Sequence, residues 1–347
     1  VPMAASYVNN SPHLVAPVIV LLLTCLCSMI FATLATRPIH MTGYTSQDDI
    51  KHGRSNFFFF GNFYRMGIQE FDDLFEAIPK ELQAAELDIP EGLSEMEMMQ
   101  HVRKVAARNS TSLVNFCGAG FYDHYIPAAV NALASRGEFY TAYTPYQPEA
   151  SQGTLQAAFE YQTAICRLTG MEVANASMYD GASALAEALL MAIRISKKKR
   201  TVAISSAVHP HYREVVRTYL APGPFEIVEL PFGTDGRTDL SALTEIDDLA
   251  GVALQSPNFF GVIEDHAAAA ELVHERDALY IASFSEPLTF GLYKNPGSLG
   301  ADIVCGEGQS FGMNQSYGGA GLGMFGCTQK FVRNMPGRVV GQTVDKD

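Results

Sequence analysis

The stretch from Asp180 to Ser205, DGASALAEALLMAIRISKKKRTVAIS, decides the fold of this chain. Its first part, Asp180 to Ser196, is rich in Ala and Leu and predicts a long helix. Its last part, Thr201 to Ser205, is a short apolar run that predicts a buried strand. The basic run Lys197 to Arg200 lies between them, where positive charge suits a helix C-terminus; a binding patch is the alternative. A helix that leads into a buried strand is the repeating unit of an α/β fold.

The same alternation continues toward the C-terminus. Further strands are predicted at Phe225 to Glu229, Gly251 to Gln255, Ala278 to Ala282 and Asp302 to Cys305. Helical stretches are predicted between them at Tyr212 to Tyr219, Leu240 to Ile246 and Asp265 to Arg276. Apolar strands separated by helices imply a mostly parallel sheet that is covered on both faces.

Two helices are predicted upstream from their end signals. Ser94 and Glu97 have the spacing of a capping box, which opens a helix that runs to about Arg108. A second helix is predicted from Gly153 to Thr169, and Gly170 is placed to end it in a left-handed conformation.

The first 36 residues contain no Asp, Glu, Lys or Arg. Within them, Leu14 to Leu34 is long and apolar enough to span a bilayer as a helix. The basic residues Arg37, Lys51 and Arg54 all follow this run, which favours a cytoplasmic location for the rest of the chain. A buried core helix is the alternative.

Composition excludes some classes of function. The 347 residues carry a formal net charge of -13, which argues against a nucleic-acid partner because phosphate binding needs clustered Lys and Arg. The six cysteines form no C-x-x-C pair, so we expect neither a zinc site nor a thioredoxin-like redox motif, and we expect reduced thiols.

Several long stretches resemble the α-type subunit of glycine dehydrogenase (decarboxylating), the P-protein of the glycine cleavage system. The resemblance covers roughly Phe71 to Asp347 without a large gap. The stretches that carry it are FCGAGFYDHYIP (116–127), FYTAYTPYQPEASQGT (139–154), FEYQTAICRLTG (159–170), VANASMYDGASALA (173–186), SPNFFGVIED (256–265), GADIVCGEG (300–308) and MPGRVVGQTVD (335–345).

This resemblance implies the large α/β domain of a fold-type-I enzyme dependent on pyridoxal phosphate (PLP), located in the cytoplasm. It implies an enzyme that decarboxylates glycine and transfers the aminomethyl group to the lipoyl arm of H-protein. The expected partners are glycine dehydrogenase subunit 2 (β) and lipoylated H-protein. PLP would supply the electron sink for decarboxylation.

The resemblance also implies that this chain lacks the groups that hold PLP. The catalytic β subunit carries a His-Lys-Thr-Phe motif with the Schiff-base lysine, and the matching stretch here is Gly308-Gln309-Ser310-Phe311. Gln309 cannot form a Schiff base. The β subunit also ends a strand with an aspartate, whereas Tyr280 to Phe284 holds no acid and the next acid is Glu286. We therefore expect no catalytic residue here, and expect PLP on the β subunit.

Two groups of residues are candidates for a vestigial cofactor site. Asp180-Gly181-Ala182-Ser183 opens a helix with small residues and exposed N–H groups, which is the layout of a phosphate site, although helix packing alone explains it too. His209 follows a strand, where PLP enzymes stack a ring on the cofactor; a structural imidazole is the alternative. We expect no metal at His209 and His211, because no carboxylate or Cys has matching spacing.

The stretch Thr144 to Glu149, TPYQPE, is the strongest candidate for a functional loop. Two prolines stiffen it, and no helix or strand period explains it. Because enzymes of this class complete their site across a dimer interface, we expect its side chains to face the partner's site; a rigid structural loop at that interface is the alternative. The candidates are Tyr143, Thr144, Tyr146, Gln147, Glu149, Ser151 and Gln152.

Three segments are predicted: 1–66 with a transmembrane helix at 14–34, 67–150 with helices and the interface loop, and 151–347 as a PLP-transferase-like α/β domain whose small C-terminal domain is missing. Residues 14–66, notably LATRP and FFFFGNFYRM, resemble the membrane domain of Pycsar-type effectors. The alternative interpretation is that residues 45–50 are a degraded remnant of the first helix of the P-protein. The alternative functions are a membrane-anchored effector fusion and an inactive PLP-fold scaffold.

Overall fold

The computed structural model describes residues 75–83, 89–114, 116, 120–140 and 143–344. The chain divides into two compact units, Val1–Asn109 and Ser110–Asp347. The predicted segment boundaries at residues 66 and 150 stay predictions, and each unit is described separately below.

In the first unit, the main described element is helix α5 (Glu95–Ala106). Its capping box is confirmed: the Ser94 Oγ accepts the Glu97 N–H at 3.4 Å, and the Glu97 Oε2 accepts the Ser94 N–H at 3.0 Å. A short 3-10 helix, η4 (Lys80–Leu82), precedes it. These reciprocal bonds satisfy two N–H groups that the first helical turn would leave unpaired.

The second unit is built on a seven-stranded sheet in the order β1-β7-β6-β5-β4-β2-β3. Strands β3, β2, β4, β5 and β6 are parallel neighbours, whereas β7 and β1 pair antiparallel. The mostly parallel sheet is therefore confirmed. The strands are β1 (Val173–Ala174), β2 (Thr201–Ser205), β3 (Glu226–Leu230), β4 (Leu249–Gln255), β5 (Leu279–Phe284), β6 (Ile303–Glu307) and β7 (Gly323–Cys327).

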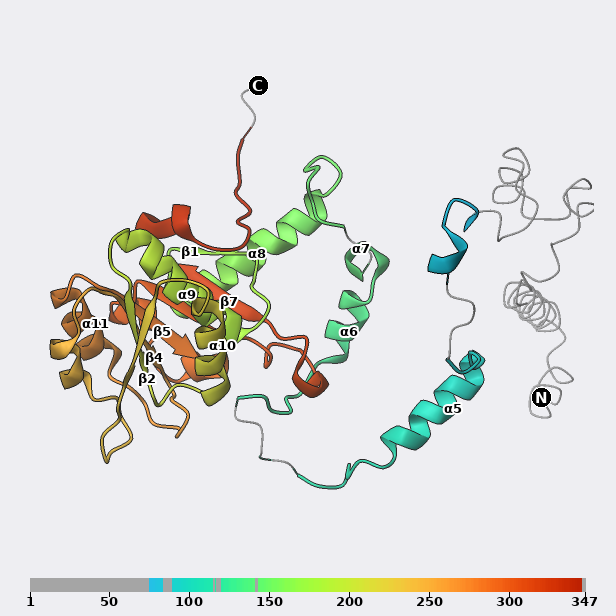
Figure 1. Ribbon diagram of the computed structural model, residues 1–347, viewed down its shortest axis with the longest axis horizontal. Coiled ribbons are helices and arrows are strands. Elements are labelled where there is room, and N and C mark those ends of the chain that lie inside the picture. Colours follow the sequence, from blue (N-terminus) through green and yellow to red (C-terminus); the bar gives the residue numbers. More distant parts are fainter. Residues whose placement is uncertain (1–74, 84–88, 115, 117–119, 141–142, 345–347) are drawn as a thin grey trace, which may run out of the picture. The chain divides into compact units, whose positions relative to one another are not determined.

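Helices cover both faces of this sheet (Figure 1). Successive side chains of one strand serve opposite faces, so Ile204 packs in the cluster with α9 and α10 while Ala203 packs in the other. The covering helices are α9 (Gly181–Ser196) and α10 (Pro210–Leu220) on one face, and α8 (Gln152–Thr169) and α11 (His266–Glu275) on the other.

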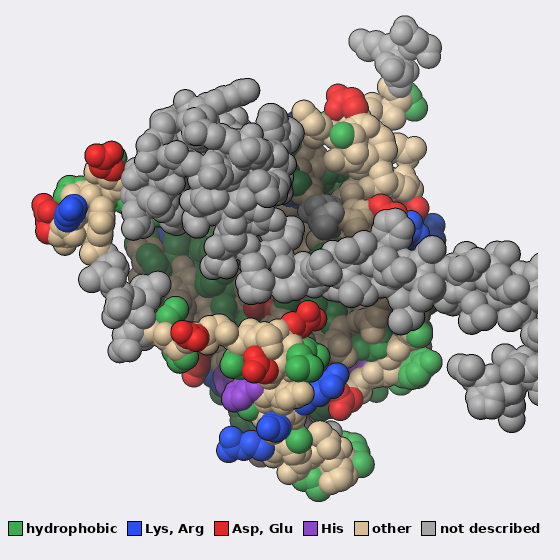
Figure 2. Space-filling view, turned by 90° about the vertical axis from the view of Figure 1, so that its right-hand side faces the viewer, with side chains coloured by type: hydrophobic (Ala, Val, Ile, Leu, Met, Phe, Trp, Pro, Cys, Tyr) green, Lys and Arg blue, Asp and Glu red, His purple; other side chains and the backbone are tan. Residues whose placement is uncertain are grey.

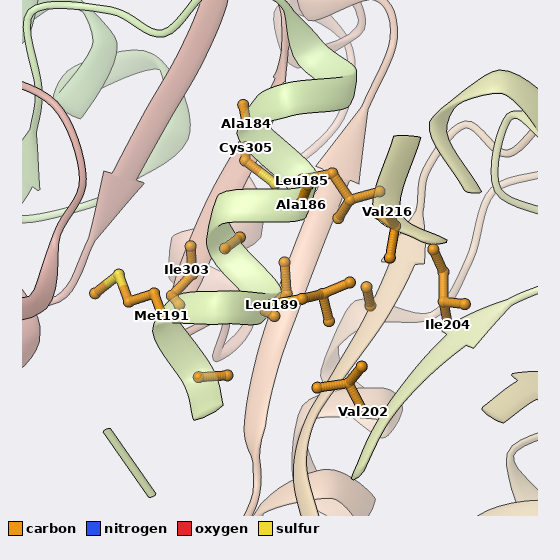
Figure 3. Packing of buried hydrophobic residues seen from close by; sticks show 14 of the residues in the cluster. Ala184, Leu185, Ala186, Leu189, Met191, Val202, Ile204, Val216, Ile303 and Cys305 are labelled. Atoms are coloured by element: carbon orange, nitrogen blue, oxygen red, sulfur yellow. The ribbon is translucent and has the colours of Figure 1, made fainter. Parts of the chain in front are cut away.

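Helix α9 is the centre of the first cluster. Figure 3 shows Leu185 and Leu189 of this helix among side chains from α10 and the strands. Both leucines are fully buried, and each contributes roughly 1.5–3 kcal/mol by leaving water. The Ala-rich composition that predicted the helix also lets it lie close to the sheet.

Shorter helices connect these elements. Gly170 ends α8 with a φ of 75°, as expected from the sequence, because glycine adopts this left-handed conformation without strain. The remaining elements are α6 (Ala128–Ala134), α7 (Gly137–Tyr140), η5 (Leu240–Glu245), η6 (Pro287–Gly291), η7 (Pro296–Leu299), η8 (Ser316–Gly318) and η9 (Gln329–Asn334).

The predicted elements match the structure to within about two residues at most ends, with two differences. The helical stretch predicted at Leu240 to Ile246 is the 3-10 helix η5 (Leu240–Glu245), and the Asp239 side chain caps it by accepting the Ser241 N–H. Strands β1 and β7 were not predicted, because a two-residue strand and a glycine-containing strand carry little periodic signal.

The basic run after α9 bonds to acids in the turns that precede β4 and β5. The Lys199 Nζ lies 3.3 Å from the Asp277 Oδ2, and the Arg200 N–H donates to the Asp248 Oδ2 at 2.8 Å. Among the described cysteines, Cys166, Cys305 and Cys327 carry free thiols.

The predicted transmembrane helix at Leu14–Leu34 lies outside the described residues, as does the whole Pycsar-like stretch 14–66 with its FFFF run. Within the described part of the chain, no helix is long and apolar enough to cross a membrane.

Candidate functional site

The carboxyl ends of the parallel strands meet at one edge of the sheet, which is where open α/β sheets bind ligands. Gln255 ends β4, Ser283 lies near the end of β5 and Glu307 ends β6. The strand register places Gln255 beside Ser283. His209 and Gln309 follow β2 and β6 at the same edge. This edge therefore gathers most of the residues that correspond to a cofactor site.

Gln309 is 1% exposed, and its amide is turned toward the backbone of its own chain. Its Nε2 donates to the Met313 carbonyl oxygen at 2.7 Å and lies 3.2 Å from the Tyr122 carbonyl oxygen. These bonds tie the end of β6 to the segment around Tyr122. An uncharged amide held in this way can neither form a Schiff base nor transfer a proton.

No carboxyl group lies in β5, and Glu286, the first acid after this strand, contacts neighbouring segments of the chain. The Glu286 Oε1 accepts from the Ser310 Oγ at 2.7 Å and from the Leu288 N–H at 3.0 Å. Its Oε2 lies 3.3 Å from the His124 Nε2. Glu286 therefore holds together the loops at this edge, where it contacts two other segments of the chain.

His209 contacts its own chain through both its backbone and its ring. Its Nδ1 accepts the His211 N–H at 3.1 Å and so begins helix α10, and its own backbone N–H donates to the Gln255 Oε1 at 2.8 Å. The ring stacks on Tyr212 with centroids 5.0 Å apart and meets the edge of Phe259. The imidazole is thus packed between aromatic rings of the protein itself.

The proposed phosphate site at the start of α9 is a capping box. The Asp180 Oδ1 accepts the Ser183 N–H at 2.7 Å, and the Ser183 Oγ accepts the Asp180 N–H at 3.2 Å. The Gly181 N–H donates to the buried carboxylate of Glu307 at 2.9 Å. Burial raises the pKa of Glu307, while the N–H donors of Leu322, Gly181 and Gln309 oppose that rise. The N–H groups of Gly181 and Ser183 are therefore bonded to carboxylates of the protein.

The residues at this edge do not fit PLP. A lysine, an acid at the end of β5 and free N–H groups at the start of α9 would be required. The chain has Gln309, a strand β5 without an acid, and a helix start bonded to Glu307 in those places.

The loop predicted to face a partner lines a hollow of about 530 Å³. Tyr143 and Tyr146 are 81% and 70% exposed, and their rings meet edge to face at 6.3 Å. The lining consists of Glu138, Tyr143, Thr144, Tyr146, Gln147, Ala150, Ser151 and Thr154. Five of the seven predicted residues are in this set; Glu149 and Gln152 are not. The Gln152 Nε2 instead donates to the Pro148 carbonyl oxygen at 2.7 Å.

Arg338, from the C-terminal part of the chain, contacts Tyr146 of this hollow, and no sequence pattern marked it as a site residue. Its Nη2 donates to the Tyr146 hydroxyl at 3.3 Å, and its guanidinium lies 5.1 Å from the centroid of the Tyr146 ring. A cation over the face of an aromatic ring is a favourable contact. Arg338 therefore fixes the orientation of one wall of the hollow.

A larger hollow, about 710 Å³, lies elsewhere. It is lined by Arg200, Phe225, Glu226 and Asp248 among others, at the amino ends of the strands and away from the residues discussed above. On the face seen in Figure 2, the described acidic and basic side chains are interspersed. No group of three or more His, Cys, Asp or Glu suited to a metal occurs among the described residues.

Comparison with known proteins identifies the family. Residues 62–347 match the family described as Glycine cleavage system P-protein. The chain belongs to this family. The match begins before the predicted start at Phe71 and includes residues 62–66 of the Pycsar-like stretch. The comparisons give no support to the Pycsar resemblance.

The chain shares about half of its aligned residues with each of two relatives. It is 56% identical over 283 residues to a probable glycine dehydrogenase (decarboxylating) subunit 1 of Desulfotalea psychrophila, covering 81% of this chain and 63% of that protein. It is 53% identical over 283 residues to the protein of the same description from Geotalea uraniireducens, with the same coverage. The chain thus spans about 63% of the length of these relatives.

Solved structures support the same assignment. The crystal structure of glycine decarboxylase (P-protein) of the glycine cleavage system, in inhibitor-bound form, superposes with a TM-score of 0.78 at 43% identity, covering 87% of this chain and 66% of that one. Mouse CSAD superposes with a TM-score of 0.58 at 13% identity, covering 80% of this chain and 61% of that one, and shows the fold alone. The fold is that of fold-type-I PLP-dependent enzymes.

Proposed function

We propose that this chain is the non-PLP-binding subunit of glycine dehydrogenase (aminomethyl-transferring). The enzyme would decarboxylate glycine and transfer the aminomethyl group to the lipoyl arm of H-protein. The description of its relatives as subunit 1 supports a second, β subunit as its partner. The activity is a proposal because the chain spans only part of the length of those relatives.

The observation that carries the proposal is the state of Gln309. The side chain at the lysine position is a buried amide that is hydrogen-bonded to the backbone of its own chain. PLP therefore belongs on the partner subunit, where it supplies the electron sink for decarboxylation. This chain contributes to the active site only by shaping and orienting it.

The hollow at residues 143–154 is the surface that would do this. Its exposed tyrosine rings and its hydroxyl and amide groups can wall off and orient a small polar substrate. We propose that the seven loop residues predicted from the sequence face the partner's site, and that Arg338 holds Tyr146 in position. Glu149 and Gln152 lie outside the lining and would then contact the partner at its rim.

Co-expression with a β subunit tests this function. Gel filtration should give a stable heteromer, and borohydride reduction followed by peptide mass spectrometry should find the PLP-modified lysine on the β chain. Glycine–CO2 exchange should require both chains. A β subunit that exchanges at full rate alone, or a lone chain that never assembles, would contradict the proposal and favour an inactive scaffold.

The enzyme's expected location is the cytoplasm. Membrane fractionation of the chain with and without residues 1–66 tests anchorage through residues 14–34. Pelleting that is lost on deletion would support an anchor.

A further inference from the structure

Glu307 is a buried carboxylate with two backbone donors from distant parts of the chain. It is 1% exposed at the end of β6. Its Oε2 accepts the Gly181 N–H at 2.9 Å, and its Oε1 accepts the Leu322 N–H at 2.8 Å. The two donors lie 126 and 15 residues away in the sequence. One carboxylate thus joins the start of α9 to the end of the β6–β7 loop.

Glu307 accepts the Gly181 N–H, which belongs to the first turn of α9, where helices commonly bind anions. The first N–H groups of a helix have no partner within the helix, and they carry the positive end of its dipole. In α9 the Gly181 N–H is bonded to Glu307, and the Ser183 N–H is bonded to Asp180. The N–H groups of Gly181 and Ser183 therefore already have carboxylate partners.

The backbone around the carboxylate is closely packed. A Cβ added at Gly181 would lie 2.4 Å from the Tyr212 hydroxyl oxygen and 2.7 Å from the Glu307 nitrogen. A Cβ added at Gly321 would lie 3.0 Å from the Glu307 Oε2 and 2.9 Å from the Asp180 Cβ. Atoms of the protein thus pack around the carboxylate from the helix, from the loop and from α10.

We propose that the Glu307 carboxylate is an internal anion that occupies the phosphate position at the start of α9, so that this chain's cofactor site is closed from within. This goes beyond the loss of the lysine at Gln309. Restoring a lysine would not restore the site, because the helix N–H group would still be bonded to Glu307. The carboxylate instead holds the glycine-rich β6–β7 loop against α9.

The test compares Glu307→Ala with the wild-type chain in chloride and in inorganic phosphate at matched ionic strength. In chloride the variant should melt on the order of 5–10 °C lower, because it loses two hydrogen bonds to a charged acceptor. Phosphate should recover at least half of that deficit in a saturable manner, and calorimetric titration should detect its binding. The wild-type chain should show neither effect.

A second variant keeps the test decisive if Glu307→Ala does not fold. Glu307→Gln retains the volume but offers only one acceptor, so its melting temperature should fall, amide exchange at Gly181 and Leu322 should accelerate, and phosphate should not rescue it. Glu226→Gln, which changes an exposed acid of β3, is the matched control.

Three results would overturn the proposal: saturable phosphate binding by the wild-type chain, wild-type stability of Glu307→Gln, or a folded Glu307→Ala whose deficit phosphate does not reduce. Because these measurements use this chain alone, their outcome is independent of the proposed activity.

Discussion

Gln162 of α8 hydrogen-bonds both backbone groups of Val340, a residue 178 positions away. Its Nε2 donates to the Val340 carbonyl oxygen and its Oε1 accepts the Val340 N–H, both at 2.9 Å. Close by, the Asn175 Nδ2 donates to the Pro336 carbonyl oxygen at 2.9 Å. The segment around Val340 forms no helix or strand, so side-chain amides take the part that a neighbouring strand would otherwise take.

Replacing Gln162 with Leu should release this segment. The substitution leaves two backbone groups of Val340 without their partners, so we expect a loss of about 1–3 kcal/mol in the free energy of unfolding. In the variant, amide hydrogen exchange around Val340 should be faster than in the wild-type chain, whereas exchange in α9 should not change. Gln156→Leu, on the exposed face of the same helix, is the control and should change neither quantity. Unchanged exchange at Val340 would show that the amide does not hold the segment.

The buried pair His266–Tyr280 should make stability depend on pH. The His266 Nδ1 lies 2.6 Å from the Tyr280 hydroxyl oxygen, and burial lowers the pKa of His266 from 6.5 to about 4. The unfolded chain therefore binds a proton at a higher pH than the folded chain. The stability that this histidine contributes is fully present above pH 6.5 and is lost as the pH falls toward 4, by up to about 3 kcal/mol.

Urea unfolding of the wild-type chain and of His266→Gln at pH 7.5, 6 and 5 checks this. The variant cannot titrate, so the difference in unfolding free energy between the two chains should shrink as the pH falls. A difference that stays constant across this range would show that folding does not lower the pKa of His266.

The helices were predictable because their end signals are local. Ser94 and Glu97 lie within one turn of each other, and Gly170 directly follows the helix that it ends. The parallel strands were predictable because residues buried on both faces form continuous apolar runs. In contrast, β7 depends on pairing with β6 and β1, and its sequence GMFGC carries no periodic pattern.

The site was predictable only in part, for the same reason. Gln309 and the proline-containing loop were found because a residue type or a composition marks them. Glu307 and Arg338 were not found, because their roles come from contacts with Gly181 and Tyr146, which are 126 and 192 positions away. Before folding, a glutamate at the end of a strand and an arginine in a loop look like many others.

Gly306 should be sensitive to the smallest substitution. It lies beside Phe284 in the parallel β5–β6 pair, and an added Cβ would lie 2.2 Å from the Phe284 carbonyl oxygen. Gly306→Ala should therefore destabilise the chain by about 1–3 kcal/mol through overpacking. Gly153→Ala is the matched control, because no atom lies within 4 Å of its added Cβ and alanine favours the helix by about 0.5–1 kcal/mol. Thermal unfolding should move the two variants in opposite directions; a shared direction would contradict the packing argument.

Tyr146 provides the sharpest test of the proposed interface. Tyr146→Phe removes the hydroxyl that accepts from Arg338 but keeps the ring beneath the guanidinium, whereas Tyr146→Ala removes both contacts and one wall of the hollow. If this wall orients substrate, Tyr146→Ala should lower glycine–CO2 exchange by the assembled enzyme about tenfold, equal to about 1.4 kcal/mol of transition-state stabilisation, and Tyr146→Phe should lower it much less.

Assembly must be measured on the same samples, because a rigid structural loop at the interface would also be weakened by Tyr146→Ala. Gel filtration should show an intact heteromer for both variants. Tyr219→Ala, an exposed tyrosine on α10, controls for the loss of an aromatic side chain elsewhere. Full exchange by an intact Tyr146→Ala heteromer would exclude the loop from the active site. If glycine–CO2 exchange falls only because the heteromer no longer assembles, the loop is a structural part of the interface. A role in orienting substrate requires that intact heteromers turn over more slowly.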